Sequence, residues 1–243
     1  MSESGLTDRQ REALTRYFWL LEEHPELFSG RPHRPIVNQR DAVEKFSKEH
    51  NVVLGVLAET PYLWLINDLV QSQDSSGAAF LHPYLRIIPP PGQAKTNGIV
   101  VLATVGYGDN RADESIVLVE QERHATGTLE LELPRGFGKP GTPPEIHALE
   151  ELRTETGYVG EQAEHLGTTL TDSGTTDGAV SFFMVSVTDR ATQTPEPQEA
   201  ILRVVLLTRG ELWACIASGA IRDAFTVQAL ALYEHRLATK EAS

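Results

Sequence analysis

The stretch GFGKPGTPPEIHALEELRTETGY, Gly136 to Tyr158, has the composition of a glycine- and proline-rich loop that leads into an acidic helix. The segment from Thr142 to Glu145 is typical of a helix start, because threonine caps, proline is tolerated in the first turn, and glutamate follows three residues after the cap. Gly157 suits the left-handed residue that follows the last helical turn. The pattern therefore predicts a helix over roughly residues 143–156.

Helical periodicity sorts the side chains of this segment into two faces. Glu151 and Glu155 share one face, one turn apart, and His147 lies one turn earlier on the same stripe. The face expected to be buried carries Ile146, Leu149, Leu152 and Thr156. Two carboxylates at this spacing repel each other and, in the C-terminal half of the helix, oppose its dipole. They are either a solvated acidic surface or ligands for a divalent cation, and we expect them to face water beside Gly136.

Composition sets limits on the class of protein. The chain has 243 residues, of which 40% are hydrophobic and 23% charged, so it is long enough for one large domain or a domain with an appendage. The net charge of -13 disfavours a nucleic-acid partner, because phosphates attract basic surfaces. The same excess of carboxylates suits a protein that collects divalent cations.

Cysteine content and apolar runs bear on the compartment. Cys215 is the only cysteine, which excludes an internal disulfide and a cysteine-rich zinc site. Apolar runs such as Ile99 to Val105 are too short for a transmembrane helix, and the polar N-terminus lacks a secretory signal pattern. We therefore expect a cytoplasmic protein without a membrane partner.

The order of elements predicts an α+β protein. Thr7 to Glu23, with a capping box from Thr7 to Gln10, and a segment near Asn38 to His50 have helical patterns. From Asn51 onward, β-branched or alternating runs are separated by turn residues, and helices return near the C-terminus. We expect a helical extension over residues 1–50, a β region over 51–95, and a main domain with a mixed or antiparallel sheet over 96–243.

The central stretch resembles the Nudix box, G-x5-E-x7-R-E-U-x-E-E-x-G-U, in which U is a bulky apolar residue. It aligns without a gap, and the matching positions are Gly136, Glu151, Leu152, Glu155, Gly157 and, more loosely, Tyr158. The resemblance implies a Nudix fold, in which a mixed sheet is sandwiched between helices. It also implies that Glu151 and Glu155 hold Mg²⁺ or Mn²⁺. His147, one turn earlier, either adds a ligand or is an exposed helix histidine.

Three positions of the box depart from the pattern. Thr142 replaces the first glutamate, Glu150 replaces the arginine that normally orients the helix carboxylates, and Thr154 replaces one of the paired glutamates. Two of the three expected helix carboxylates remain. A divalent ion can still bind with water completing its shell, although a full two-metal cage has lost part of its ligands.

The resemblance extends over roughly residues 51–237 to the ADP-ribose pyrophosphatase-like members of the superfamily. Their N-terminal strands help to build a homodimer, which we therefore expect here. The resemblance implies that Arg123 and Glu132 lie near the phosphate and nucleoside-sugar groups of the substrate. Arg135 and Lys139 flank the loop that begins at Gly136, and cations on this rim suit a diphosphate.

Two acidic residues are candidates for orienting the attacking water. The loop that carries the catalytic glutamate in these relatives corresponds to DSGTTDGAV, where Gly178 occupies the glutamate position and Asp177 stands beside it. Asp177 can act through a water, or it is an ordinary turn aspartate before glycine. Glu199 also matches a recurrent acidic position.

Two functions stay open at this point. The first is a metal-dependent hydrolase of a nucleoside diphosphate-sugar such as ADP-ribose, which releases a nucleoside monophosphate and a sugar phosphate. The second is an impaired Nudix-fold protein that binds a nucleotide or nucleotide sugar as a sensor or partner-binding module. The retained pair of helix carboxylates favours the enzyme, whereas Glu150, Thr154 and Gly178 favour the binding protein.

Overall fold

The computed structural model describes residues 5–93, 95–106 and 114–241. The chain forms two compact units, of which the first comprises Met1–Lys95 with Thr171–Gly178 and the second Thr96–Leu170 with Ala179–Ser243. The first four residues of the predicted helical extension lie outside the described residues. Within the described part, no helix combines the length and apolar character needed to cross a membrane.

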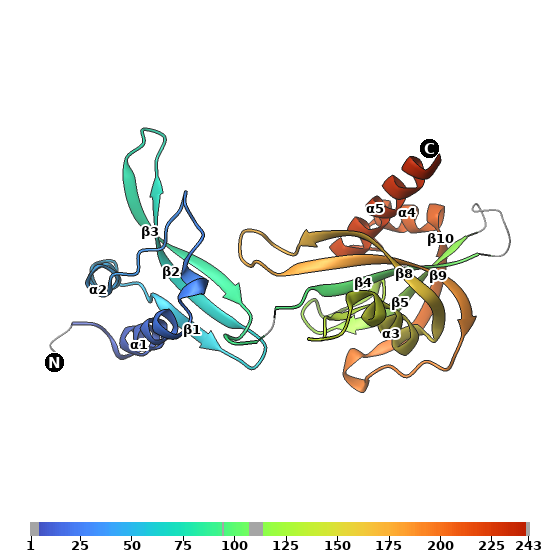
Figure 1. Cartoon of the computed structure of the whole chain (residues 1–243), viewed down its shortest axis with the longest axis horizontal. Helices are drawn as coiled ribbons and strands as arrows, with labels where there is room; N and C mark the ends of the chain where they lie inside the picture. The colour runs from blue at the N-terminus through green and yellow to red at the C-terminus, as the bar shows by residue number, and fades with distance from the viewer. Residues whose placement is uncertain (1–4, 94, 107–113, 242–243) are drawn as a thin grey trace. The chain divides into compact units, whose positions relative to one another are not determined.

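The first unit packs two helices against a three-stranded sheet (Figure 1). Helix α1 begins after Thr7, whose side chain forms the predicted capping box with Gln10. The strands pair antiparallel in the order β1-β2-β3. The elements are α1 (Asp8–Glu23), η1 (Pro25–Phe28), α2 (Arg40–Glu49), β1 (Gly55–Glu59), β2 (Trp64–Gln73) and β3 (Ala79–Ile88).

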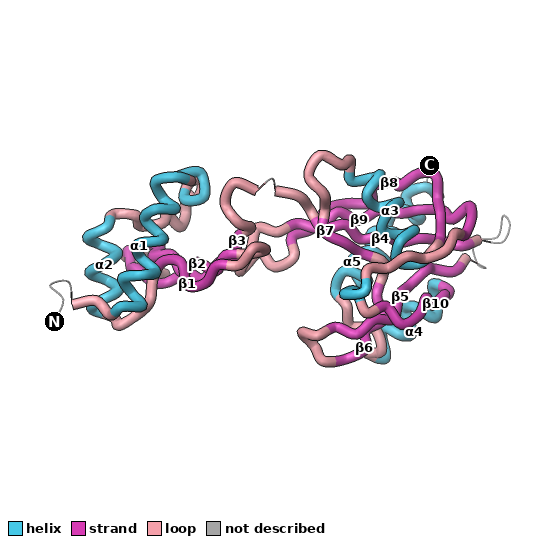
Figure 2. The backbone as a smooth tube through the Cα atoms, turned by 90° about the horizontal axis from the view of Figure 1, so that it is seen from below, coloured by secondary structure: helices cyan, strands magenta, loops and turns pink. Residues whose placement is uncertain are grey.

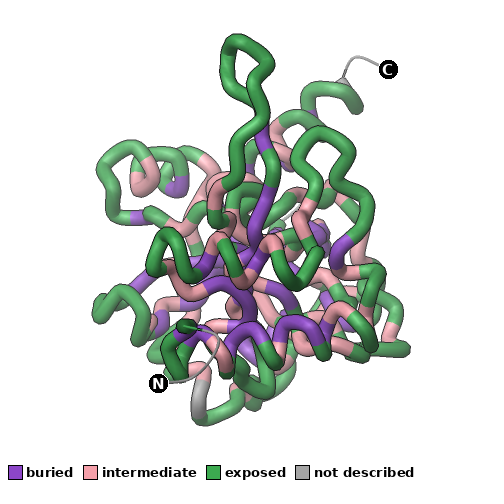
Figure 3. The backbone as a smooth tube through the Cα atoms, turned by 90° about the vertical axis from the view of Figure 1, so that its left-hand side faces the viewer, coloured by how far each residue is buried: buried purple, intermediate pink, exposed green. Residues whose placement is uncertain are grey.

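A buried polar group lies inside the core of this unit. Tyr17, Leu20, Ile66 and Leu69 are fully buried, and the Tyr17 hydroxyl donates a 2.7 Å hydrogen bond to Asp68. Burial is the main reason that the pKa of Tyr17 is raised, and the neighbouring carboxylate adds to it. The tip of the β2–β3 hairpin is exposed (Figure 3).

The second unit contains the larger sheet and three helices. Its sheet has the order β10-β5-β4-β9-β8, with β6 paired to β5 and β7 paired to β4. The β4–β9 pair is parallel and the other pairs are antiparallel, so the sheet is mixed. The elements are β4 (Gly98–Val105), β5 (Ser115–Arg123), β6 (Thr128–Glu132), β7 (Arg135–Phe137), α3 (Pro144–Thr156), β8 (Tyr158–Leu170), β9 (Ala179–Arg190), η3 (Pro197–Glu199), β10 (Ile201–Thr208), α4 (Arg209–Ser218) and α5 (Ala224–Glu241).

Alternation along β4 explains the layers of this unit, since successive side chains of a strand point to opposite faces. Val100 and Leu102 join the core that contains α4 and α5. Ile99 and Val101 join the core that contains Leu152 of α3. Helix α3 therefore covers one face of the sheet and α4 and α5 cover the other, as Figures 1 and 2 show. The predicted α+β class, with a mixed sheet sandwiched between helices, is confirmed.

Helix α3 differs in detail from the sequence-based prediction. Pro143 precedes its first residue, and Thr142 makes no side-chain cap, so the predicted threonine cap is wrong. The helix ends as predicted at Gly157, which has a φ of 77°. Ile146 was expected to be buried but is half exposed. The buried residues are His147, Ala148, Leu152, Glu155 and Thr156. Ala148 and Leu152 pack on the sheet core, and the backbone of β7 reaches Glu155.

Candidate functional site

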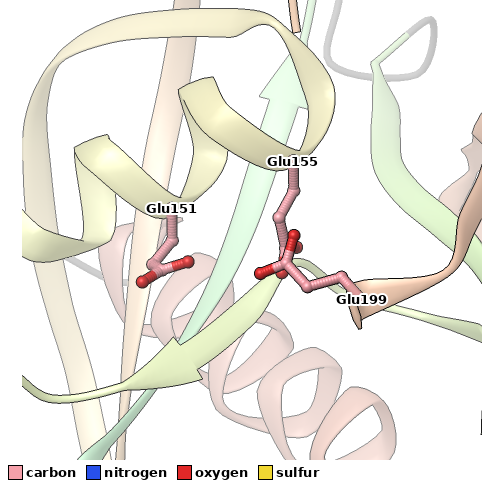
Figure 4. Close-up of side chains that lie close together, drawn as sticks. All are labelled: Glu151, Glu155 and Glu199. Carbon is pink, nitrogen blue, oxygen red and sulfur yellow. The ribbon is translucent and has the colours of Figure 1, made fainter. Parts of the chain in front are cut away.

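Three glutamates from two segments of the second unit gather at the side of α3. Glu151 and Glu155 come from the helix, and Glu199 comes from η3 at the end of the loop before β10. Each offers a carboxylate oxygen, and these oxygens all lie within 4.8 Å of one another. Figure 4 shows Glu155 and Glu199 pointing toward one another, with Glu151 one turn along the helix. This group is called the glutamate cluster below.

Local backbone geometry brings Glu199 to the cluster. One oxygen of its side chain accepts a 2.9 Å hydrogen bond from the backbone N–H of Glu196, which closes a tight turn. Ala200 then adopts a left-handed conformation with a φ of 51°, and the chain enters β10. A non-glycine residue in that conformation is uncommon. The reversal presents the Glu199 carboxylate to the helix.

The electrostatics of the cluster disfavour three negative charges. Burial, followed by the charges of Glu199 and Glu151, raises the pKa of Glu155 to about 8, against a 3.2 Å hydrogen bond from the backbone N–H of Arg135 that lowers it. The pKa of Glu199 is also raised, first by burial. A bound cation offsets both the desolvation and the mutual repulsion, so this donor set fits a hard divalent ion with oxygen ligands.

The expectation that both helix carboxylates face water is wrong for Glu155, which is only 2% exposed. Strand β7 lies against this side of the helix, and its Arg135 backbone N–H reaches the carboxylate. Glu151 is half-buried beside Gly136. The pair therefore points inward at Glu199 rather than outward at bulk solvent.

The substituted box positions do not join the cluster. Glu150 is exposed and lies 3.4 Å from the Lys139 ammonium, so this carboxylate and this rim cation pair with each other. The Thr154 hydroxyl donates to the backbone carbonyl of Glu150, one turn earlier. The hydroxyl hydrogen of Thr154 is therefore used in a hydrogen bond within the helix. The cluster takes its third carboxylate from Glu199 instead.

Arg123, Glu132 and Arg135 form a charged network on β5 to β7. Oxygen Oε2 of Glu132 lies 2.6 Å from Nη2 of Arg123 and 2.8 Å from Nη2 of Arg135. Gln121 donates to the same carboxylate at 3.1 Å, and Arg135 also reaches Asp223 at 3.0 Å. Glu132, expected beside the substrate, is therefore a buried anchor for the two arginines. Gln121 and Asp223 were missed by sequence reasoning, since no local spacing links them to this group.

Asp177 lies in the first unit and is not a member of the glutamate cluster. Its carboxylate forms a 2.9 Å ion pair with the ammonium of Lys95. Both residues border a cavity of about 1060 Å³ in that unit, which is also lined by Arg34, Tyr84 and Arg86. The neighbouring Gly178 donates its N–H to the Thr176 hydroxyl within the same turn.

Comparison with known proteins supports the same family. The chain is 32% identical over 135 residues to an ADP-sugar pyrophosphatase from Mus musculus, covering 54% of this chain and 62% of the relative. It is 30% identical over 134 residues to a nudix hydrolase from Caenorhabditis elegans, covering 53% of this chain and 59% of the relative. The alignments thus span about three fifths of the length of these curated relatives. No protein-family profile matches the chain.

A solved structure extends the likeness to the fold. The crystal structure of an ADP compounds hydrolase superposes with a TM-score of 0.57 at 17% identity, covering 76% of this chain and 91% of that one. The mixed sheet between helices is therefore a fold that this chain shares with the ADP compounds hydrolase. In sequence, the chain is similar to proteins named ADP-sugar pyrophosphatase and nudix hydrolase.

Proposed function

We propose that the protein hydrolyses the diphosphate bond of a nucleoside diphosphate-sugar such as ADP-ribose, and that it requires Mg²⁺ or Mn²⁺. The products are a nucleoside monophosphate and a sugar phosphate. The glutamate cluster is the observation that carries this proposal, because three carboxylate oxygens within 4.8 Å of one another suit a divalent ion. The names of the ADP-sugar pyrophosphatase and ADP compounds hydrolase relatives support the choice of substrate.

Glu151 and Glu155 are the residues that would hold the ion, and the Glu199 carboxylate lies beside them. When bound, a divalent ion neutralises a diphosphate and lowers the pKa of a coordinated water. The buried position of Glu155 and its contact with the Arg135 backbone keep its carboxylate in place before any ligand arrives. Such preorganisation avoids reorganisation during the reaction.

Arg123 and Arg135 are the residues proposed to meet the diphosphate. Both guanidinium groups are anchored on Glu132, which limits their rotation. About a third of the Arg123 side chain stays exposed, against a fifth for Arg135, so Arg123 is the better placed to contact a ligand. A guanidinium group matches the geometry of phosphate oxygens and holds a positive charge at any working pH.

Glu199 is the residue proposed to orient the attacking water and accept its proton. It lies in the glutamate cluster, is half-buried, and has a raised pKa, which brings a carboxylate closer to the basicity that general-base catalysis needs. The other candidate, Asp177, is already paired with Lys95. These contacts favour Glu199 over Asp177.

The homodimer expected from the resemblance remains part of the proposal. Strand β3 in the first unit exposes large apolar side chains, since Phe80, Leu81 and Leu85 are 46%, 38% and 45% exposed. Neighbouring apolar side chains on one strand favour burial against another protein surface. A second copy of the chain is the proposed partner.

The alternative function, nucleotide-sugar binding without turnover, rests on the altered box. Glu150 supplies a negative charge where the family has a cation, and the Thr154 hydroxyl is engaged by the helix backbone. A site with fewer metal ligands can retain affinity for a diphosphate and lose the chemical step.

One experiment tests both functions. Purified full-length protein is incubated with a panel of nucleotide sugars and Mg²⁺ or Mn²⁺, and monophosphate release is followed beside ligand binding by calorimetry. Glu155→Gln is expected to abolish metal-dependent turnover, and Glu199→Gln to lower kcat by roughly 10²–10⁴ with substrate binding retained. Glu150→Gln, an exposed neighbour outside the cluster, is the control and is expected to keep its activity.

Tight binding without turnover in the wild-type protein would instead support the sensor. Turnover that proceeds equally well with a chelator present would contradict the metal-dependent reaction.

A further inference from the structure

His147 lies one turn before Glu151 on α3, wholly buried at 1% exposure. Its Nε2 atom is 2.6 Å from Oε1 of Glu151. The contact is close, but it lacks hydrogen-bond alignment, and among the described residues neither ring nitrogen has another hydrogen-bond partner. Burying an imidazole whose nitrogen atoms make no hydrogen bond destabilises the folded state, so such a residue calls for an explanation.

Glu151 also lies against Gly136. A Cβ atom at residue 136 would collide with both oxygens of the Glu151 carboxylate, so the carboxylate lies directly against the glycine backbone. The imidazole of His147 and the backbone of Gly136 thus both lie against this carboxylate.

No other basic side chain within the described ranges lies at ion-pair distance from Glu151. The adjacent Glu150 pairs with Lys139, and Arg123 and Arg135 pair with Glu132. His147 is also not a member of the glutamate cluster itself. Along the helix it lies one turn before Glu151, whereas Glu155 lies one turn after it.

We propose that His147 is a positioning residue, which holds the Glu151 carboxylate in the orientation that meets a divalent ion at the glutamate cluster. A ligating carboxylate that is held by a neighbouring donor loses less freedom when the ion binds, and such supporting contacts commonly change metal affinity 10- to 100-fold. The inference rests on the proposed function for the presence of the ion. It adds to that function a residue that supports a ligand without binding the ion.

The test compares two substitutions of the same residue in the full-length protein. His147→Gln keeps an N–H donor near the position of the imidazole Nε2, whereas His147→Leu fills the volume without a donor. Mn²⁺ affinity is measured by electron paramagnetic resonance of the free ion and by calorimetry, and stability by thermal unfolding. His147→Leu is expected to weaken Mn²⁺ binding by about 10-fold or more, and His147→Gln to recover most of the loss.

Leu149→Ala is the matched control for packing. Leu149 lies on the same helix and packs against the core without touching the cluster, so this variant is expected to lose stability and keep its Mn²⁺ affinity. Wild-type affinity in His147→Leu would overturn the inference. So would equal weakening in the Leu and Gln variants, since that outcome assigns His147 a packing role.

The readouts also separate this inference from the proposed function. Mn²⁺ binding that depends on residue 147, without any turnover in the wild-type protein, would refute hydrolysis and leave the positioning role intact. Turnover with Mn²⁺ affinity and kcat unchanged in His147→Leu would refute the positioning role alone. A wild-type protein that binds no Mn²⁺ would overturn both.

Discussion

Nη2 of Arg123 lies 2.6 Å from Oε2 of Glu132, which joins β5 and β6 by an ion pair whose carboxylate is almost completely buried. Arg135 approaches the same carboxylate from β7. One buried negative charge thus orders two guanidinium groups beside the glutamate cluster. The ion pairs that link β5, β6 and β7 therefore also hold in place the two arginines proposed to bind phosphate.

Replacing Arg123 with alanine is expected to affect both stability and substrate affinity. The Glu132 carboxylate would keep Arg135 and Gln121 but lose its shortest partner, at a cost of about 1–3 kcal/mol in the free energy of unfolding. KM for the nucleotide sugar should rise as well. Urea unfolding and steady-state kinetics measure the two effects.

Arg203→Ala is the control for the Arg123 variant. Arg203 pairs with Glu120 at 2.8 Å, but its side chain is 65% exposed, so its loss should change the free energy of unfolding much less and leave KM unchanged. Equal effects of the two substitutions would contradict the special role given to Glu132.

Gly136→Ala is expected to disturb the site more than the fold. The added methyl would meet the carboxylate of Glu151, which is the flexible end of a side chain and can move aside. Stability should therefore change little, whereas Mn²⁺ affinity and turnover should fall as Glu151 leaves its position. Thermal unfolding and Mn²⁺ titration check the two parts.

The same substitution at Gly138 is the comparison. There the methyl would meet the backbone carbonyl of Asn97, which cannot move aside cheaply, so Gly138→Ala should lower the unfolding temperature clearly. A Gly136→Ala protein as unstable as Gly138→Ala would show that Gly136 serves the fold rather than the carboxylate.

The stability of the metal-free protein should depend on pH through Glu155. Its pKa is about 8 in the folded chain and near 4.5 when unfolded, so between these values the folded state binds more protons than the unfolded state. Stability is therefore greatest at low pH in this window and is lost as pH rises toward 8. The slope from this one group is at most about 1.4 kcal/mol per pH unit.

Glu155→Gln should flatten this dependence, because the amide does not titrate. Saturating Mg²⁺ should raise the unfolding temperature most at the alkaline end, where the ion replaces the proton. Chemical unfolding of chelator-treated protein from pH 5 to pH 8 provides the measurement. A wild-type profile that matches the Gln variant would contradict the raised pKa.

The proposed homodimer is expected to depend on β3. Leu85→Glu places a charge on an exposed apolar position of this strand and should shift the protein toward the monomer in light scattering. Leu129→Glu, at a position of similar exposure on β6 of the second unit, should leave the oligomeric state unchanged. A wild-type monomer at all concentrations would refute the dimer.

Local patterns were enough to locate most elements and one half of the site. The loop before residue 144 and Gly157 after residue 156 limit helix α3, within one residue of the predicted bounds at each end. Because the helical repeat alone places Glu151 and Glu155 one turn apart, their pairing was predictable. These features depend on neighbouring residues in the chain, which local propensity and periodicity describe well.

The burial of the helix faces was less predictable. Leu152 and Thr156 are buried as expected, but Ile146 is half exposed and Glu155 is buried, because strand β7 packs on the carboxylate side. The hydrophobic pattern of a helix indicates which of its residues favour burial. It does not indicate which strand or loop will pack against each face of the helix. A three-residue strand such as β7 carries too short a pattern to be predicted.

The sequence by itself determined the mixed α+β architecture, the limits of the acidic helix and the spacing of its two carboxylates. Only the tertiary structure decided that Glu199 rather than Asp177 joins them, that Glu132 anchors Arg123 and Arg135, and that His147 and Gly136 lie against Glu151. The physical reason is that these contacts join residues that are far apart in the chain. They depend on which strands pair and on the paths of the connecting loops, and the spacing of residues in the sequence does not specify either.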